Sequence, residues 1–138
     1  MDSKNPESHP LFPSGEWEGF YTYGMGPGTS QHRMAFFLDF KDGVVSGSGG
    51  DDVGAFNWRG SYDTKQLICQ MTKRYATHAV HYDGKVDENG IWGTWIIGDY
   101  FKGGFHIWPK QNEQNEEAEQ VAEEPEAIEQ GKPAKTAT

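Results

Sequence analysis

The sequence has a single cysteine, Cys69, among its 138 residues. One cysteine cannot form an internal disulfide, and it cannot supply the cysteine pairs of a structural zinc site. The chain also lacks the run of about 18–20 apolar residues that a transmembrane helix needs, and its N-terminal segment lacks the apolar stretch of a secretory signal. These absences predict a cytoplasmic protein that has no membrane partner.

Basic residues are scarce as well. Lys and Arg number 12 against 21 Asp and Glu, which gives a formal net charge of −9. Nucleic acids and anionic membranes are bound through clustered cations, so neither partner is expected. Residues 110–138 contain eight Glu and only three Lys, and no aromatic residue follows Trp108. Such a segment cannot bury enough apolar area to offset its ordering entropy, so residues 110–138 are expected to form a disordered acidic tail.

Aromatic residues and glycine dominate the rest of the chain. Every aromatic residue lies between Phe12 and Trp108, together with 17 of the 18 glycines. This distribution predicts one compact domain over residues 15–109. Residues 1–14 are polar and contain three prolines, so we expect a flexible N-terminal segment from which Leu11 and Phe12 could dock onto the domain.

Alternation of polar and apolar residues with a period of two predicts eight short strands, and no helix longer than two turns is expected. Short turns rich in Asp, Asn and Gly separate the strands. Closing such a meander removes its exposed edges, so we predict a single antiparallel up-and-down β-barrel. The expected strands are Trp17–Tyr23, Gln31–Phe40, Val44–Gly49, Ala55–Tyr62, Leu67–Tyr75, Ala79–Val86, Ile91–Ile97 and Gly104–Trp108.

The same alternation predicts which side chains face the barrel interior. The expected core consists of Met34, Phe36, Leu38, Phe40, Phe56, Trp58, Tyr62, Leu67, Cys69, Met71, Val80, Tyr82, Ile91, Trp95 and Ile97. Phe37 and Trp92 fall on the opposite face. Cys69, among apolar neighbours, is expected to be a buried and inert thiol.

An aromatic-x-Gly-x-aromatic pattern recurs along the domain. It occurs as Trp17–Tyr21 and Trp58–Tyr62, with related forms at Tyr82–Val86 and Ile91–Trp95. At strand spacing, the two large residues and the central glycine share one face. The glycines then serve either to let the strands coil sharply, as small barrels require, or to hollow out a pocket lined by Trp and Tyr.

The opening strand Gly15-Glu16-Trp17-Glu18-Gly19 begins an up-and-down meander of about eight strands, and this resembles the calycin group of lipocalins, fatty-acid-binding proteins and avidin-like barrels. The chain has neither the helical lid of fatty-acid-binding proteins nor the paired cysteines of many lipocalins. It is also similar to a small barrel domain of uncharacterised proteins through Gly49–Phe56, Lys73–Tyr75, His78–Gly84, Gly93–Trp95 and Gly104–Phe105. The resemblance implies a barrel fold and ligand binding, and it names no ligand.

A polar group near one end of the barrel is the best candidate for a site. The parity of the strand Leu67–Tyr75 directs Lys73 and Tyr75 to the same face as its apolar residues. An inward Lys73 could meet an anionic group of a ligand, whereas a Lys73 at the rim would extend to water. The candidate ligand-binding residues are Trp58, Lys73, Tyr75, His78, Tyr82 and Trp95.

Other polar motifs give weaker predictions. His78 and His81 are three apart on a strand and point to opposite faces, so no metal site is expected, and no cofactor is predicted. Asp51 and Asp52 lie in a glycine-rich loop that we expect to be a solvated hairpin rather than a calcium site. The loop Gly24–Thr29 is a candidate lid for the barrel mouth.

Three functions remain open from the sequence. The leading one is non-catalytic binding of a small, largely apolar or aromatic ligand inside the barrel. The second is a protein-interaction module with a filled core, either monomer or homodimer, that acts through Phe37, Trp92 and the acidic tail. The third is a small barrel-cavity enzyme with His78 or His81 as acid–base and Tyr75 or Tyr82 assisting. No catalytic constellation is recognisable, so the protein is not predicted to be an enzyme.

Overall fold

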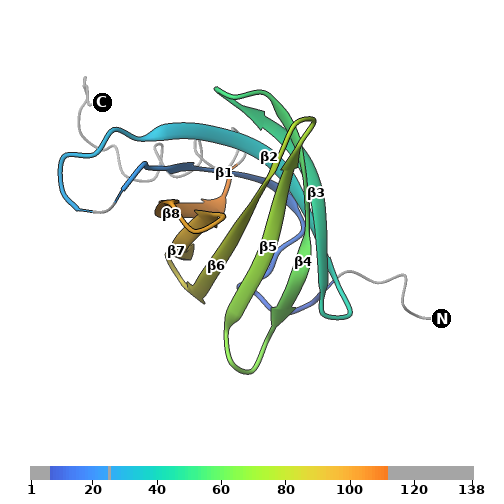
Figure 1. Cartoon of the computed structure of the whole chain (residues 1–138). Coiled ribbons are helices and arrows are strands. Elements are labelled where there is room, and N and C mark those ends of the chain that lie inside the picture. Colours follow the sequence, from blue (N-terminus) through green and yellow to red (C-terminus); the bar gives the residue numbers. More distant parts are fainter. Residues whose placement is uncertain (1–6, 25, 112–138) are drawn as a thin grey trace, which may run out of the picture.

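The computed structural model describes residues 7–24 and 26–111. Eight antiparallel strands pair in chain order, and β1 also pairs with β8 to close a barrel (Figure 1). The predicted all-β, eight-stranded antiparallel barrel is therefore confirmed, whereas the predicted acidic tail lies almost wholly outside the described residues. The strands are β1 (Gly15–Tyr21), β2 (His32–Lys41), β3 (Val44–Asp51), β4 (Ala55–Asp63), β5 (Ile68–Tyr75), β6 (Ala79–Asp87), β7 (Gly90–Ile97) and β8 (Phe101–Pro109).

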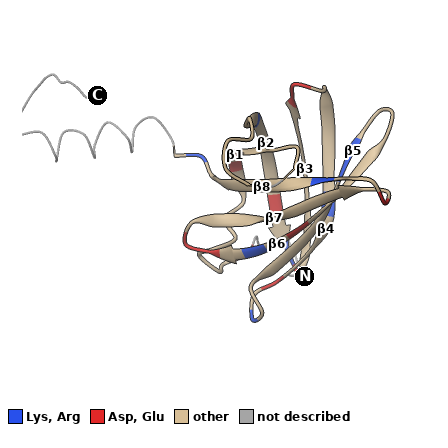
Figure 2. Ribbon diagram, turned by 60° about the vertical axis from the view of Figure 1, so that its left-hand side comes forward, with Lys and Arg blue, Asp and Glu red and all other residues tan. Residues whose placement is uncertain are grey.

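Local turn chemistry explains why consecutive strands form hairpins. Between β2 and β3, Asp42 and Gly43 both have positive φ, of 53° and 80°, which matches the twist of a two-residue hairpin turn. At the end of β4, the Asp63 carboxylate accepts backbone hydrogen bonds from Lys65 and Gln66. Figure 2 shows acidic residues at several of these turns. No helix in the described part of the chain is long and apolar enough to cross a membrane.

The barrel has two different ends. We call the end where β1, β3, β5 and β7 finish the mouth, and the opposite end the base. Phe12 is completely buried at the base, where its ring lies 5.4 Å from the ring of Phe40 and 4.8 Å from that of Tyr62. Glu7 adds a backbone hydrogen bond to Phe40 and accepts one from the Tyr62 hydroxyl. The residues that precede β1 therefore plug the base.

Side chains fill the barrel interior. All fifteen residues expected to face inward pack in the core, with Leu67 and Ile97 partly buried at its edge and the others buried. Aromatic rings from several strands contact one another edge to face, a preferred arrangement for such pairs. Cys69 is buried as predicted, and burial raises the pKa of its thiol to about 12.

Three of the four glycines of the repeated aromatic pattern allow neighbouring backbones to approach closely, whereas Gly84 makes room for the side chains of Ile91 and Phe105. A Cβ atom on Gly19, Gly60 or Gly93 would lie 2.2, 1.9 or 2.1 Å from a backbone oxygen of the adjacent strand. Such contacts are too short for any side chain. The space beside Gly19, Gly60 and Gly93 is therefore filled by backbone. This favours the explanation that these glycines let the strands coil sharply over the explanation that they hollow out a pocket.

Substitution of two glycines tests this explanation. We expect Gly60→Ala to lower the free energy of unfolding by about 1–3 kcal/mol, because the new methyl group would collide with the Gln70 carbonyl. Gly50→Ala is the matched control, since its Cβ would meet only an oxygen 3.7 Å away. The control is expected to be neutral or to stabilise by up to about 1 kcal/mol. Urea unfolding measures both, and equal effects would refute the close-approach argument.

Candidate functional site

Lys73 is the one buried cationic side chain among the described residues. It belongs to the inward face of β5, as its parity predicted, and its side chain is only 1% exposed. The ammonium therefore does not reach water at the rim. Five aromatic rings have their centroids within 6 Å of its Nζ atom, close enough for cation–π attraction: Tyr21, Phe56, Tyr82, Tyr75 and Trp58, at 4.5, 4.8, 5.1, 5.2 and 5.7 Å.

Asp51 neutralises this cation. Its Oδ2 atom lies 2.7 Å from Lys73 Nζ and accepts a 2.5 Å hydrogen bond from the Tyr75 hydroxyl. Its Oδ1 atom accepts hydrogen bonds from the backbone N–H groups of Val53 and Gly54. The Asp51 side chain is wholly buried, and both of its oxygens have partners, as a buried carboxylate requires.

Burial and this ion pair affect protonation in opposite ways. Burial lowers the pKa of the Lys73 ammonium below its ordinary value, while the hydrogen bond and charge of Asp51 counteract that shift. Burial also raises the pKa of Tyr75, and its hydrogen bond to Asp51 raises it further. Tyr75 is therefore a hydrogen-bond donor in the folded protein.

A second carboxylate in the same hairpin makes a parallel set of contacts. Asp52 Oδ1 accepts a 2.5 Å hydrogen bond from the Tyr21 hydroxyl, and Asp52 Oδ2 lies 2.6 Å from His32 Nδ1. The His32 ring stacks on Tyr21 with a centroid separation of 5.0 Å. The hydrogen bond from Tyr21, followed by that from His32, lowers the pKa of Asp52. Two adjacent carboxylates thus attach the β3–β4 turn to the mouth, Asp51 in the interior and the half-exposed Asp52 at the rim.

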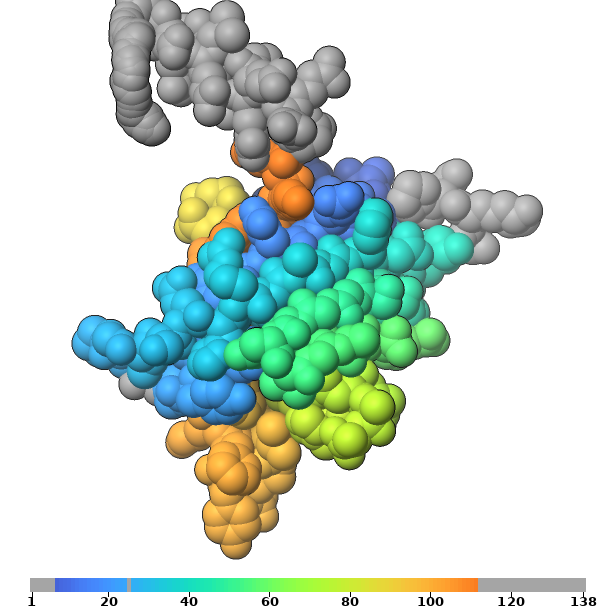
Figure 3. Space-filling model, turned by 90° about the horizontal axis from the view of Figure 1, so that it is seen from above, coloured from blue at the N-terminus to red at the C-terminus, as the bar shows by residue number. Residues whose placement is uncertain are grey.

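A small pocket opens at the mouth above Lys73. Its volume is about 30 Å³, room for about two water molecules. In the view from above, the green, lime and orange turns of β3–β4, β5–β6 and β7–β8 adjoin one another (Figure 3). The pocket is lined by Tyr21, Tyr23, Val53, Lys73, Tyr75, His78, Val80, Tyr82, Trp95 and Ile97.

Five of the six predicted ligand-binding residues line this pocket: Lys73, Tyr75, His78, Tyr82 and Trp95. The His78 ring stacks on Tyr75, and the Trp95 indole N–H donates to the backbone carbonyl of Thr22. The sixth residue, Trp58, lies deeper in the core, with its ring 4.9 Å from that of Tyr82. Its indole N–H is the one buried side-chain donor among the described residues that has no acceptor.

The expectation of a solvated Asp51–Asp52 hairpin is wrong for Asp51. Residues 46–51 belong to β3, and the Asp51 side chain points into the barrel rather than into solvent. One signal in the sequence could have located it. A lysine directed into an aromatic core needs a counter-ion, and Asp51 is an acidic residue at the same end of the barrel. Sequence reasoning also missed the cluster that Asp52 forms with Tyr21 and His32.

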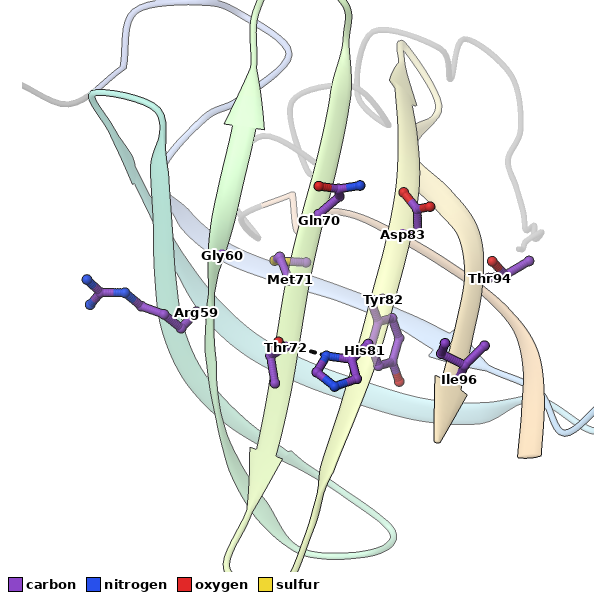
Figure 4. Close-up of a pocket in the computed structure, with 10 residues that line it drawn as sticks. All are labelled: Arg59, Gly60, Gln70, Met71, Thr72, His81, Tyr82, Asp83, Thr94 and Ile96. Atoms are coloured by element: carbon purple, nitrogen blue, oxygen red, sulfur yellow. Dashed lines mark hydrogen bonds between the residues drawn. The ribbon is translucent and has the colours of Figure 1, made fainter. Parts of the chain in front are cut away.

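The other polar candidates do not join the mouth. His81 faces outward, 3.1 Å from the Thr72 hydroxyl. It lies beside a depression of about 360 Å³ that polar and apolar residues of β4 to β7 line (Figure 4). His78 lies in the turn between β5 and β6, so the strand spacing on which the opposite-face prediction rested does not apply to it. It lines the mouth, whereas His81 points outward from β6. Across residues 7–24 and 26–111, no group of three or more His, Cys, Asp or Glu could hold a metal ion.

The outer wall carries the predicted exposed aromatics at separate places. Phe37 is exposed on β2 and pairs with Glu16, whereas Trp92 is exposed on β7 and pairs with His106. Residues 26–29, part of the expected lid, line a depression beside Trp92 rather than the mouth pocket. Within the loop between β1 and β2, it is Tyr23 that lines the mouth.

Comparison of the chain with protein-family models, with curated proteins and with solved structures found no match.

A double-mutant cycle tests the energetic role of the buried pair. Either Lys73→Met or Asp51→Asn alone should lower the free energy of unfolding by about 3–5 kcal/mol, because each leaves an uncompensated charge in the core. The double variant should lose less than the sum, with a coupling energy of about 1–3 kcal/mol in urea unfolding. Asp63→Asn combined with Lys73→Met is the control and should be additive. Additivity for Asp51 and Lys73 would contradict a shared ion pair.

Four buried tyrosines, three at the mouth and Tyr62 at the base, should make the fold sensitive to alkali. Burial raises the pKa of Tyr21, Tyr75 and Tyr82, and it raises that of Tyr62 to about 12. A tyrosine whose pKa is raised by folding contributes stability that is complete below pH 10. This stability is lost as the pH rises above 10, because the tyrosine then ionises in the unfolded chain but not in the folded protein. Lys73 acts in the opposite sense, but it is one group against the four tyrosines and the buried thiol of Cys69. The midpoint temperature of thermal unfolding should therefore decrease as the pH is raised from 10 to 12.

The absorbance of tyrosinate at 295 nm provides the check. The titration curve of the wild-type protein minus that of Tyr82→Phe isolates the ionisation of Tyr82. It should appear only together with loss of the near-ultraviolet circular dichroism signal. A difference curve with its midpoint near pH 10 in protein that is still folded would contradict the argument.

Proposed function

We propose that this protein is a calycin-like barrel that binds a small, largely apolar or aromatic ligand without catalysing its conversion. The observation that carries the proposal is the convergence of Lys73, Tyr75, His78, Tyr82 and Trp95 on one pocket at the mouth. Ligand sites commonly combine apolar and aromatic walls with a few polar groups that fix orientation. Here the aromatic rings are the walls, and the buried ammonium is the orienting group.

The dimensions of the mouth restrict the ligand. A filled core leaves about 30 Å³ at this end, so a long fatty chain has no space along the barrel axis. Room for one aromatic ring has to come from side chains at the lip. Val53 and Tyr23 are both about half exposed. Val53 can turn outward freely, whereas Tyr23 has to give up its edge-to-face contacts with Tyr21, His32 and Trp95. The ligand of this proposal is therefore a one-ring or two-ring molecule held at the mouth.

Titration with indole and with benzamide, followed by two-dimensional ¹H–¹⁵N NMR, tests the proposal. Binding should shift the Trp95 indole N–H and the backbone amides of Val53 and Tyr75 in a saturable way. Val53→Trp should abolish these shifts while the protein stays folded, because the larger side chain at the exposed lip covers the pocket.

Val44→Trp supplies the matched control. Val44 is also an exposed valine, but it is the first residue of β3 and therefore lies at the base of the barrel. The same substitution there should leave the shifts unchanged. Shifts that are scattered over the outer wall, or that survive in Val53→Trp, would refute binding at the mouth.

A further inference from the structure

The position of Asp51 suggests the chemical class of the ligand. We propose that its carboxylate is a resident stand-in for the carboxylate of a small aromatic acid, which displaces the β3–β4 turn and pairs with Lys73 and Tyr75. This inference rests on the proposed function, because it assigns the ligand of the same pocket. The turn is then a built-in competitor that sets the affinity of the site.

The donors beneath the pocket form a complete carboxylate-binding site. Lys73 Nζ and the Tyr75 hydroxyl both donate to one oxygen, Asp51 Oδ2, at 2.7 and 2.5 Å. Lys73 Nζ also lies 3.0 Å from the Tyr75 oxygen, so the two donors are held together when the carboxylate is absent. Charge-assisted hydrogen bonds of this kind are among the strongest that a protein makes. A carboxylate from solution can accept the same pair.

The Asp51 carboxylate reaches the site from a turn rather than from the middle of a strand. Asp51 is the last residue of β3, and Gly50 before it and Gly54 after it flank the turn. Val53 at the tip is half exposed. Outside the strand pairing, the Asp51 and Asp52 side chains are the main attachments of this turn to the mouth. Moving Asp51 outward therefore breaks the ion pair with Lys73, the hydrogen bond from Tyr75 and the last β2–β3 pair, Met34 with Asp51. The remaining strand pairs of the barrel wall stay in place.

The surrounding walls suit an aromatic acid. Tyr82, Trp95 and Tyr21 border the pocket next to the ammonium, so a ring attached to the bound carboxylate would contact other rings. A neutral ring lacks the group that replaces Asp51. It would leave the turn in place and would bind only against the lip.

Benzoate and its neutral analogue benzamide separate these cases. In the full-length protein, Asp51→Ala removes the resident carboxylate, and benzoate should then bind at least tenfold more tightly than it binds the wild type. The physical reason is that the donors are no longer occupied by a competing group. Benzoate should also raise the thermal midpoint of Asp51→Ala by more than equimolar sodium chloride does, while benzamide should have the same effect on both proteins.

Two further variants serve as controls. Asp63→Ala removes a carboxylate that likewise caps a turn through two backbone N–H groups, but it lies at the base, away from Lys73, the buried cation among the described residues. Benzoate should not restore its stability. Lys73→Met combined with Asp51→Ala removes the cation and should bind benzoate no better than benzamide. If Asp51→Ala does not fold, Asp51→Asn takes its place, because the amide oxygen can still accept the hydrogen bonds from the backbone of the turn. The same tenfold gain in benzoate affinity is expected of this variant.

The outcomes distinguish the two proposals. If benzamide and indole bind at the mouth but Asp51→Ala and Asp51→Asn gain no affinity for benzoate, Asp51 is a permanent structural partner and the inference fails alone. If none of the three compounds shifts the mouth residues in any of these proteins, the proposed function fails as well. A benzoate gain that persists without Lys73 would also overturn the inference.

Discussion

The ion pair between Lys73 and Asp51 is the constraint on which the mouth of this barrel depends. A cation that is 1% exposed and surrounded by five rings is stable only when a carboxylate reaches it. That requirement fixes where β3 ends, how the β3–β4 turn folds inward and which way Tyr75 donates its proton. The arrangement of Asp52 with Tyr21 follows, because the next residue of the same turn is carried to the rim.

The two ends of the barrel solve the problem of closure with different chemistry. At the base, Phe12 fills the space with a ring, and the polar contacts of Glu7 lie around it. At the mouth, a charged pair and tyrosine hydroxyls take that place. The apolar plug at the base presents no hydrogen-bond donor or acceptor to a ligand. At the mouth, the donors of Lys73 and Tyr75 lie directly beneath the β3–β4 turn. Binding chemistry is therefore concentrated at one end.

The sequence predicted the barrel because alternation with a period of two leaves little choice of face once one side is apolar. The same argument placed Lys73 inward and grouped it with Tyr75, Tyr82 and Trp95. It could not place Asp51, because a carboxylate among glycines has the local pattern of a solvated turn. Its burial is decided by a lysine 22 residues away, on a strand that β4 separates from β3. Phe12 likewise precedes the first strand and has no periodic partner.

The seam between β1 and β8 has a consequence for synthesis of the chain. Trp17 pairs with Pro109, so the two strands that close the barrel come from opposite ends of the domain. The hairpins in between join neighbouring residues and can form as the chain emerges from the ribosome. The last seam has to wait until residue 109 is free, and contacts of such long range slow folding. Until then the edges of β1 and β7 are open to other strands, which is the interval in which chaperones would matter most.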